Sequence, residues 1–254
     1  MLVLLAKNWT PKIDPTDYWL SEKLDGVRAY WTGSQFLSRN GNVFHAPEFF
    51  TQGLPPIALD GELWLGRKQF QSAVGIVKTQ SGAKDEMWRD ITFQVFDAPD
   101  ASGAFEARMQ YVEATLQGLC FAQPLSHVRC DGVDHLLQYL RDVELAGGEG
   151  VMLRAPNSAY ERKRSASLLK VKTFHDAEAT VTAHEPGKGK HAGRLGALVC
   201  VTAAGVPFNV GTGFRDADRA APPAIGSRIT YSYQELTESG APRFPVFVRR
   251  FADL

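Results

Sequence analysis

The chain has 254 residues, of which 44% are hydrophobic and 22% charged, a composition typical of a soluble globular protein with room for one large and one small domain. Twenty-eight basic and 28 acidic residues give a net charge of zero, so attraction to nucleic acid must come from clustered charge. No run is apolar enough for a transmembrane helix, and the spacing of Cys120, Cys130 and Cys200 excludes an ordinary zinc site. Buried free thiols are expected, with a Cys120–Cys130 disulfide as the alternative in an oxidising compartment.

The first part of the chain mixes strands and helices. Turn signals recur at 25–26, 32–33 and 40–41, so residues 18–42 are predicted to form an antiparallel meander of short strands. The spacing of apolar residues then predicts a strand at 57–65, a helix at 68–79, a strand at 91–96, helices at 105–119 and 133–145, and strands at 150–154 and 168–173. These elements predict an α+β domain over residues 1–174, with antiparallel sheets and flanking helices.

From residue 175 onward the pattern of apolar residues changes: helical periodicity disappears, and glycine and proline clusters separate short apolar runs. Strands are predicted at 179–184, 197–202, 206–211, 228–234 and 244–248. Five short strands in about eighty residues fit an OB-fold β-barrel, a scaffold that commonly binds nucleic acid. We therefore predict an OB-fold domain over residues 175–254, with a linker near residues 174–177.

The segment Lys-Leu-Asp-Gly-Val-Arg, residues 23–28, combines a lysine with groups that can tune its reactivity. A lysine is a nucleophile only when deprotonated; Asp25 would raise the pKa of Lys23, whereas Arg28, a divalent metal and desolvation would lower it. Further segments follow in a fixed order: Ser-Arg-Asn-Gly at 38–41, Asp-Gly-Glu-Leu at 60–63, Phe-Gln-Val-Phe-Asp at 93–97, Glu-Gly-Val-Met-Leu-Arg at 149–154 and Leu-Lys-Val-Lys at 169–172. From about residue 5 to the C-terminus, this series resembles the ATP-dependent DNA ligases of the covalent nucleotidyltransferase superfamily, and in particular their minimal bacterial type, which lacks accessory domains.

The resemblance implies that Lys23 attacks ATP to form a lysyl-AMP adduct, that AMP passes to the 5′-phosphate of a nick in duplex DNA, and that the 3′-hydroxyl then closes the nick. It implies catalytic roles for Lys23, Asp25, Lys170 and Lys172, and nucleotide contacts from Glu22, Arg28, Glu62, Phe96, Glu149, Arg164, Lys170 and Lys172. Lys170 and Lys172 are two positions apart, so they project from one face of a strand toward a phosphate. Asp25 and Glu149 are the expected ligands of Mg²⁺, for which Mn²⁺ could substitute.

Basic clusters suggest how DNA would be held. By the same resemblance Arg39 grips the 5′-phosphate of the nick and Arg28 touches the AMP ribose or the 3′ end. Further DNA contacts are expected from Arg162, Lys188, Lys190 and Arg194. Arg164 stands in Lys163-Arg164-Ser165, where the family usually has Gly-Arg-Ser, so its contact is less well defined. We expect a bacterial monomer, cytoplasmic or, if a leader was removed, periplasmic, that acts in DNA repair, replication or recombination.

Two alternatives remain open at this stage. RNA ligases and mRNA-capping guanylyltransferases use the same lysine motif, so RNA or GTP could be the substrate; the Ser-Arg-Asn-Gly segment and the compact barrel favour DNA. A noncatalytic OB-type binder with a decayed transferase domain is the alternative from another class, although every reactive residue is present. Incubation with labelled ATP or GTP would separate the nucleotide choices.

Overall fold

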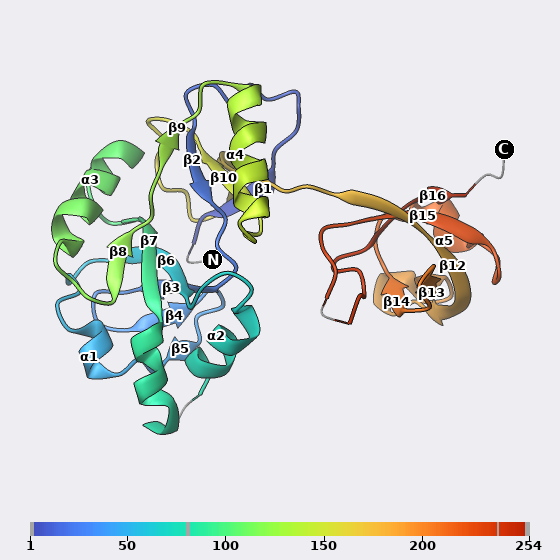
Figure 1. Cartoon of the computed structure of the whole chain (residues 1–254), viewed down its shortest axis with the longest axis horizontal. Helices are drawn as coiled ribbons and strands as arrows, with labels where there is room; N and C mark the ends of the chain where they lie inside the picture. The colour runs from blue at the N-terminus through green and yellow to red at the C-terminus, as the bar shows by residue number, and fades with distance from the viewer. Residues whose placement is uncertain (1–2, 80–81, 238, 252–254) are drawn as a thin grey trace. The chain divides into compact units, whose positions relative to one another are not determined.

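The computed structural model describes residues 3–79, 82–237 and 239–251 and divides the chain into two compact units, Met1–Lys172 and Thr173–Leu254. Figure 1 shows the elements of both units, and each unit has its own buried apolar core. The first unit combines two sheets with helices and the second is mainly β-structure, so the predicted α+β class is confirmed. No helix in the described ranges is long and apolar enough to cross a membrane.

A six-stranded sheet forms the larger part of the first unit. Its order is β5-β4-β3-β6-β7-β8, and its strands are β3 (Val27–Trp31), β4 (Phe36–Ser38), β5 (Val43–Phe44), β6 (Leu59–Trp64), β7 (Thr92–Asp97) and β8 (Ala122–Pro124). Neighbours are antiparallel except β7 and β8. Helices α1 (Glu48–Thr51), α2 (Phe70–Val77) and α3 (Phe105–Leu116) and the 3-10 helix η1 (Gly82–Asp90) accompany it. Phe36, Phe50, Trp88 and Phe93 centre its core through tilted and edge-to-face ring contacts.

A five-stranded sheet completes the first unit. Its order is β1-β11-β10-β2-β9, and its strands are β1 (Leu5–Asn8), β2 (Trp19–Glu22), β9 (Val128–Arg129), β10 (Val151–Arg154) and β11 (Arg164–Val171). Helix α4 (Val133–Leu145) packs against β10 in Figure 1. Its apolar positions 136, 140 and 143 recur at helical spacing and join the buried cluster of this sheet. The helix begins and ends where the sequence predicted.

The predicted meander over residues 18–42 is wrong at its first turn. Strands β3, β4 and β5 do pair in succession, but β2 pairs with β10 and β9 in the other sheet. Residues 23–26 therefore carry the chain from one sheet to the other. Gly26 permits this crossing, because a Cβ at this position would lie 2.6 Å from the backbone oxygen of Leu63. The crossing places Lys23 between the sheets.

The second unit contains the five strands that the sequence predicted. They are β12 (His175–Pro186), β13 (Leu195–Thr202), β14 (Pro207–Val210), β15 (Arg228–Tyr233) and β16 (Val246–Arg250), with the short helices η2 (Gly189–His191) and α5 (Asp216–Ala220). The antiparallel order is β14-β13-β12-β15-β16, and the backbone N–H of Phe247 donates to Thr212, just beyond β14, over 2.9 Å. This contact draws the two edges together, as in a barrel. The expected linker at 174–177 is wrong in place, because β12 begins at His175 and pairs with β15.

Candidate functional site

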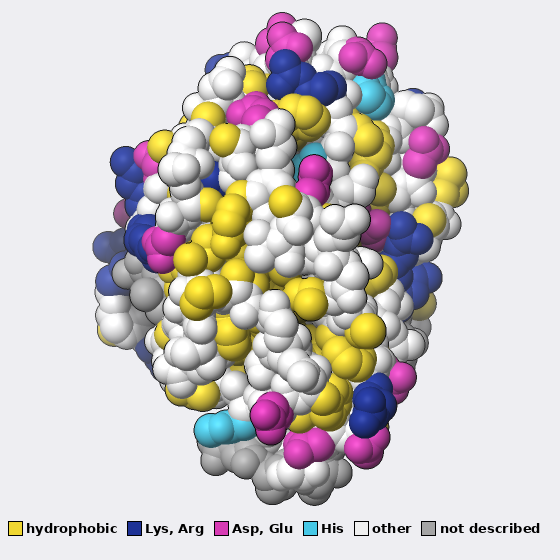
Figure 2. All heavy atoms as spheres, turned by 90° about the vertical axis from the view of Figure 1, so that its left-hand side faces the viewer, with side chains coloured by type: hydrophobic (Ala, Val, Ile, Leu, Met, Phe, Trp, Pro, Cys, Tyr) yellow, Lys and Arg dark blue, Asp and Glu magenta, His cyan; other side chains and the backbone are white. Residues whose placement is uncertain are grey.

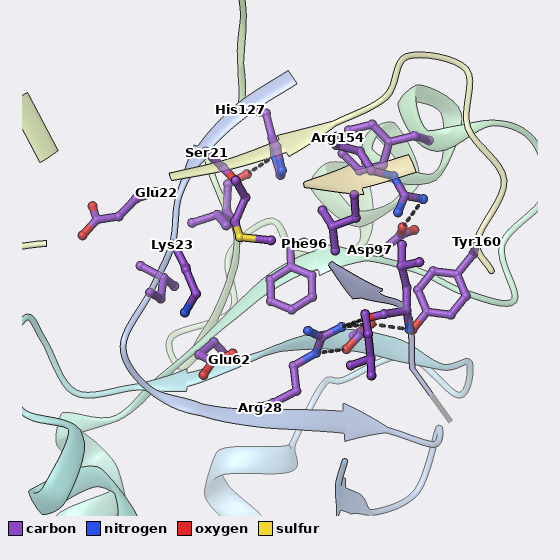
Figure 3. Close-up of a pocket in the computed structure, with 18 of the residues that line it drawn as sticks. Ser21, Glu22, Lys23, Arg28, Glu62, Phe96, Asp97, His127, Arg154 and Tyr160 are labelled. Carbon is purple, nitrogen blue, oxygen red and sulfur yellow. Dashed lines mark hydrogen bonds and ion pairs between the residues drawn. The ribbon is translucent and has the colours of Figure 1, made fainter. Parts of the chain in front are cut away.

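A pocket within the first unit lies between the five-stranded and six-stranded sheets (Figure 3). We call it the inter-sheet pocket. The five-stranded side contributes Ser21, Glu22, Lys23, Met152, Arg154 and Leu168, and the six-stranded side contributes Arg28, Arg39, Asp60, Glu62, Phe96 and Asp97. Five segments of the predicted series supply lining residues, so the fold brings together residues that lie more than a hundred positions apart.

The register of the five-stranded sheet explains why three lysines gather near one end of the pocket, where Lys23 lines it. Ser21 lies opposite Met152, and Met152 lies opposite Lys170, so the three side chains share a face. One row further along, the N–H of Lys23 donates to the oxygen of Gly150 over 2.8 Å, and Gly150 packs beside Lys172. Lys23, Lys170 and Lys172 thus belong to the same face, as the spacing of the last two predicted.

Glu149 holds two of these lysines. Its carboxylate accepts hydrogen bonds from the amines of both Lys23 and Lys172, and its side chain is only 13% exposed. Burial acts to raise the pKa of Glu149, but Lys23 and Lys172 outweigh it and hold that pKa below its usual range. Burial, with Lys172 and Lys23 nearby, lowers the pKa of Lys170. The lysine end of the pocket is therefore cationic, with one carboxylate shared by two amines.

Glu62 enters the pocket from β6 and lies beside Lys23 in Figure 3. Burial raises the pKa of its carboxyl to about 7, although Arg28 and Lys23 act in the opposite direction. A carboxyl with such a pKa exchanges its proton near neutral pH and can accept from or donate to a ribose hydroxyl. The position fits the predicted nucleotide contact.

Phe96 lies in the middle of the inter-sheet pocket, with the guanidinium of Arg28 over its ring at 4.5 Å from the centroid (Figure 3). Arg28 in turn donates two hydrogen bonds to Asp60, of 2.7 and 2.6 Å, and one to the backbone oxygen of Leu4. Tyr160 donates to the same carboxylate. The guanidinium of Arg28 thus pairs mainly with the buried Asp60 and at the same time covers one face of the Phe96 ring.

Several predicted contact residues have partners within the protein. The carboxylate of Glu22 accepts two 2.8 Å hydrogen bonds from Arg67, although Glu22 lines the pocket. Arg162 donates to Asp100 and to the hydroxyl of Tyr30, each over 2.9 Å. The exposed Arg164 donates to the backbone oxygen of residue 6. A ligand would therefore meet these three side chains already engaged within the protein.

The structure also identifies residues to which the sequence gave no role. Asp60, Asp97 and Arg154 stand inside the recognised segments, but only the fold shows that they are buried and paired. Tyr160 and His127 lie outside those segments, and both line the inter-sheet pocket. No local pattern distinguishes them from other polar residues of a loop.

The two predicted metal ligands are Asp25 and Glu149. Neither residue lines the inter-sheet pocket, but Glu149 pairs with Lys23, which does, and is close enough to Glu62 to raise the pKa of that carboxyl. In the ranges that the structure describes, no three His, Cys, Asp or Glu residues gather as a metal cluster. Mg²⁺ commonly uses only one or two carboxylates together with water and substrate phosphates. Each oxygen of the Glu149 carboxylate accepts a hydrogen bond from a lysine, so the metal role of Glu149 stays a prediction.

Basic side chains expected at DNA are exposed in both units. Arg39 is exposed and borders the inter-sheet pocket. Lys188, Lys190 and Arg194 are exposed in the connection between β12 and β13 of the second unit. Figure 2 views the side on which α1 and α3 lie in Figure 1, and hydrophobic side chains occupy the middle of that face. The middle of that face offers little for a phosphate backbone.

Comparison with known proteins agrees with this site. A family model described as the ATP dependent DNA ligase domain matches residues 4–172, and one described as the DNA ligase OB-like domain matches residues 186–250. A DNA ligase of Haemophilus influenzae is 42% identical over 238 residues, which cover 92% of this chain and 87% of that protein.

Solved structures give the same result. A structure from an analysis of Lig E DNA ligases as a minimal DNA-binding scaffold has a TM-score of 0.93 and 40% identity, covering 98% of each chain. Chlorella virus DNA ligase-adenylate has a TM-score of 0.59 and 26% identity, covering 99% of each chain. The resemblance inferred from the ordered segments is confirmed. The chain belongs to the family of ATP-dependent DNA ligases.

Proposed function

We propose that Lys23 is the residue that carries AMP during nick sealing. The observation that supports this role is its place at the lysine end of the inter-sheet pocket, paired with Glu149 and accompanied by Lys170 and Lys172. The amine attacks the α-phosphorus of ATP, a P–N bond forms, and the bond to the pyrophosphate leaving group breaks. AMP then moves to a 5′-phosphate of DNA, with return of the amine. The 3′-hydroxyl finally displaces AMP and forms the phosphodiester bond.

The charge arrangement around Lys23 suits the first step. Lys23 is an ammonium ion while it is bonded to the Glu149 carboxylate, and it must lose a proton before it can attack. Lys170 and Lys172 lie on the same face and supply positive charge toward which a phosphate can move. A divalent cation held by Glu149 would neutralise phosphate charge when it is bound with the nucleotide. Lys172 remains beside Lys23 as the second partner of that carboxylate.

The other nucleotide contacts follow from the walls of the pocket. Phe96 is proposed to stack on the base with the ring face that Arg28 leaves uncovered, and Glu62 is proposed to contact the ribose; the lining of the pocket and the position of Arg28 support both roles. Arg39, at the exposed border, is proposed to hold the 5′-phosphate of the nick. We propose that residues 1–174 form the adenylation domain and residues 175–254 a DNA-binding OB domain, and that the protein is a monomer. Within the OB domain, Lys188, Lys190 and Arg194 are proposed to contact the phosphate backbone of DNA. Asp25 is retained as a candidate second metal ligand.

The decisive experiment compares the parent with Lys23→Ala and with a matched control, Lys12→Ala, which removes an exposed lysine of the same unit. Purified protein is incubated with ATP and Mg²⁺, its intact mass is measured, and nick sealing is followed on a denaturing gel. Parent and control should gain the mass of AMP and seal the nick, whereas Lys23→Ala should do neither. An adduct that persists in Lys23→Ala, or that maps to another residue in the parent, would refute this role.

A further inference from the structure

His127 is a polar group that lines the inter-sheet pocket away from Lys23. It lies directly before β9 and lines the pocket together with Ser21 and Met152. In the β2–β9 ladder Leu20 lies opposite Val128, so the same register places Ser21 opposite His127. The row His127–Ser21–Met152–Lys170 therefore crosses four adjacent strands of one sheet face. Three strand spacings of about 4.8 Å separate its ends by roughly 14 Å.

The hydrogen bonding of His127 determines which ring nitrogen carries a proton. Its Nδ1 lies 2.8 Å from the backbone oxygen of Leu125, which can only accept, so Nδ1 is the protonated nitrogen. Burial, reinforced by the nearby positive charge of Arg154, lowers the pKa of His127 to about 4. The ring is therefore neutral at physiological pH, and its Nε2 is an acceptor. The edge-to-face contact with Phe105, 5.2 Å between ring centroids, helps to fix the ring.

The pocket thus has two chemically different ends. Lys23 lines the end that suits phosphate, and Lys170 lies near it on the same sheet face. Phe96 and Met152 lie between the ends, and His127 lies at the other end. A purine nucleotide whose phosphate lies at the lysines extends its base past Phe96 toward His127. The edge of the base then meets a hydrogen-bond acceptor whose orientation the protein has already set.

We propose that His127 selects adenine, with Nε2 accepting a hydrogen bond from the exocyclic N6 amine of the base. The inference rests on the proposed placement of AMP at Lys23. Guanine and hypoxanthine present a carbonyl oxygen at the corresponding position, where it would face another acceptor. Moving the ring proton to Nε2 would relieve that clash, but it would leave Nδ1 facing the Leu125 oxygen as two opposed acceptors. His127 is thus a specificity-determining residue that favours ATP over GTP.

The test removes the two partners of this hydrogen bond separately. The nucleotides are ATP and purine riboside triphosphate, which has hydrogen in place of the N6 amine, and the readout is the rate of AMP-type adduct formation by intact mass. The parent should prefer ATP by roughly 10- to 100-fold, the discrimination expected for one buried hydrogen bond. His127→Leu should lose that preference by reacting more slowly with ATP, while its rate with the analogue stays at the parent level. His45→Leu, an exposed histidine of the same unit, should keep the preference.

The outcomes separate this inference from the proposed function. A parent that forms no adduct with either nucleotide contradicts the role of Lys23. If the parent reacts and His127→Leu keeps the same preference for ATP over the analogue, the role of His127 is overturned. The same holds if His127→Leu reacts more slowly than the parent by an equal factor with both nucleotides. If His127→Leu does not fold, His127→Gln provides the test. The glutamine amide can present either its oxygen or its nitrogen to the base, so this variant should still form the adduct with ATP and should also form one with inosine triphosphate. If it does not react with inosine triphosphate, the inference is overturned.

Discussion

Removing the charge of Asp97 should destabilise the first unit more than most single substitutions. Asp97 accepts hydrogen bonds of 2.6 and 3.1 Å from Arg108 and pairs with Arg154 at 3.1 Å. All three side chains are at most 4% exposed, so one buried carboxylate balances two buried guanidinium groups. Burial and the charge of Arg108 lower the pKa of Arg154, whose buried Nε has no hydrogen-bond partner. Asp97→Asn would leave both arginines without a counter-charge.

Breaking a buried ion pair in this way costs about 3–5 kcal/mol of unfolding free energy. At about 2–4 °C per kcal/mol for a chain of this size, the midpoint of thermal unfolding should fall by roughly 6–20 °C. Circular dichroism melts would compare Asp97→Asn with Asp100→Asn. Asp100 is 54% exposed and pairs with the half-exposed Arg162, so its loss should cost less than about 1 kcal/mol. Equal melting of the two variants would refute the argument from buried charge.

Two further predictions concern the walls of the inter-sheet pocket. Phe96→Ala removes a stacking surface worth about 1–3 kcal/mol, so adduct formation should need a higher ATP concentration while its maximal rate survives; an unchanged ATP dependence would contradict the stacking role. Burial raises the pKa of Glu62 from its ordinary 4.5 to about 7. The folded state therefore binds this proton more tightly than the unfolded state does, so the unfolding free energy should fall as pH rises from about 4.5 through 7. Glu62→Gln should flatten that fall in a pH series of melts, and an identical slope in parent and variant would argue against it.

The elements that the sequence predicted well are those whose signals are local. Helix α4 follows Gly132 and carries apolar residues at 136, 140 and 143, so its face and its ends could be read directly from spacing. The alternation of Lys170 and Lys172 likewise required only the geometry of one strand. Most of the reactive side chains also belong to short segments whose order is recognisable without a fold.

The errors arose where partners are distant along the chain. The turn signal at 25–26 correctly marks the break between β2 and β3, but the local sequence does not determine whether these two strands pair with each other. The partner of β2 is β10, about 130 residues later, and that pairing decides that residues 23–26 cross between sheets. Arg28 shows the same limit, since Asp60, which binds its guanidinium, lies 32 residues away, and Tyr160, which donates to that carboxylate, lies 132 residues away. The sequence therefore predicts a ligand contact for Arg28 but not its partners within the protein.

His127 extends this argument to a residue for which the sequence offers no signal at all. A single histidine between a serine and a valine is compatible with surface, core or site. Its significance depends on three properties of the fold: the register that places it opposite Ser21, the Leu125 oxygen that fixes its tautomer, and the burial that keeps its ring neutral. Each is non-local or conformational, so none can be obtained from residue order. Reactive groups at the phosphate end can thus be recognised from sequence, whereas selection of the base is accessible only from the assembled pocket.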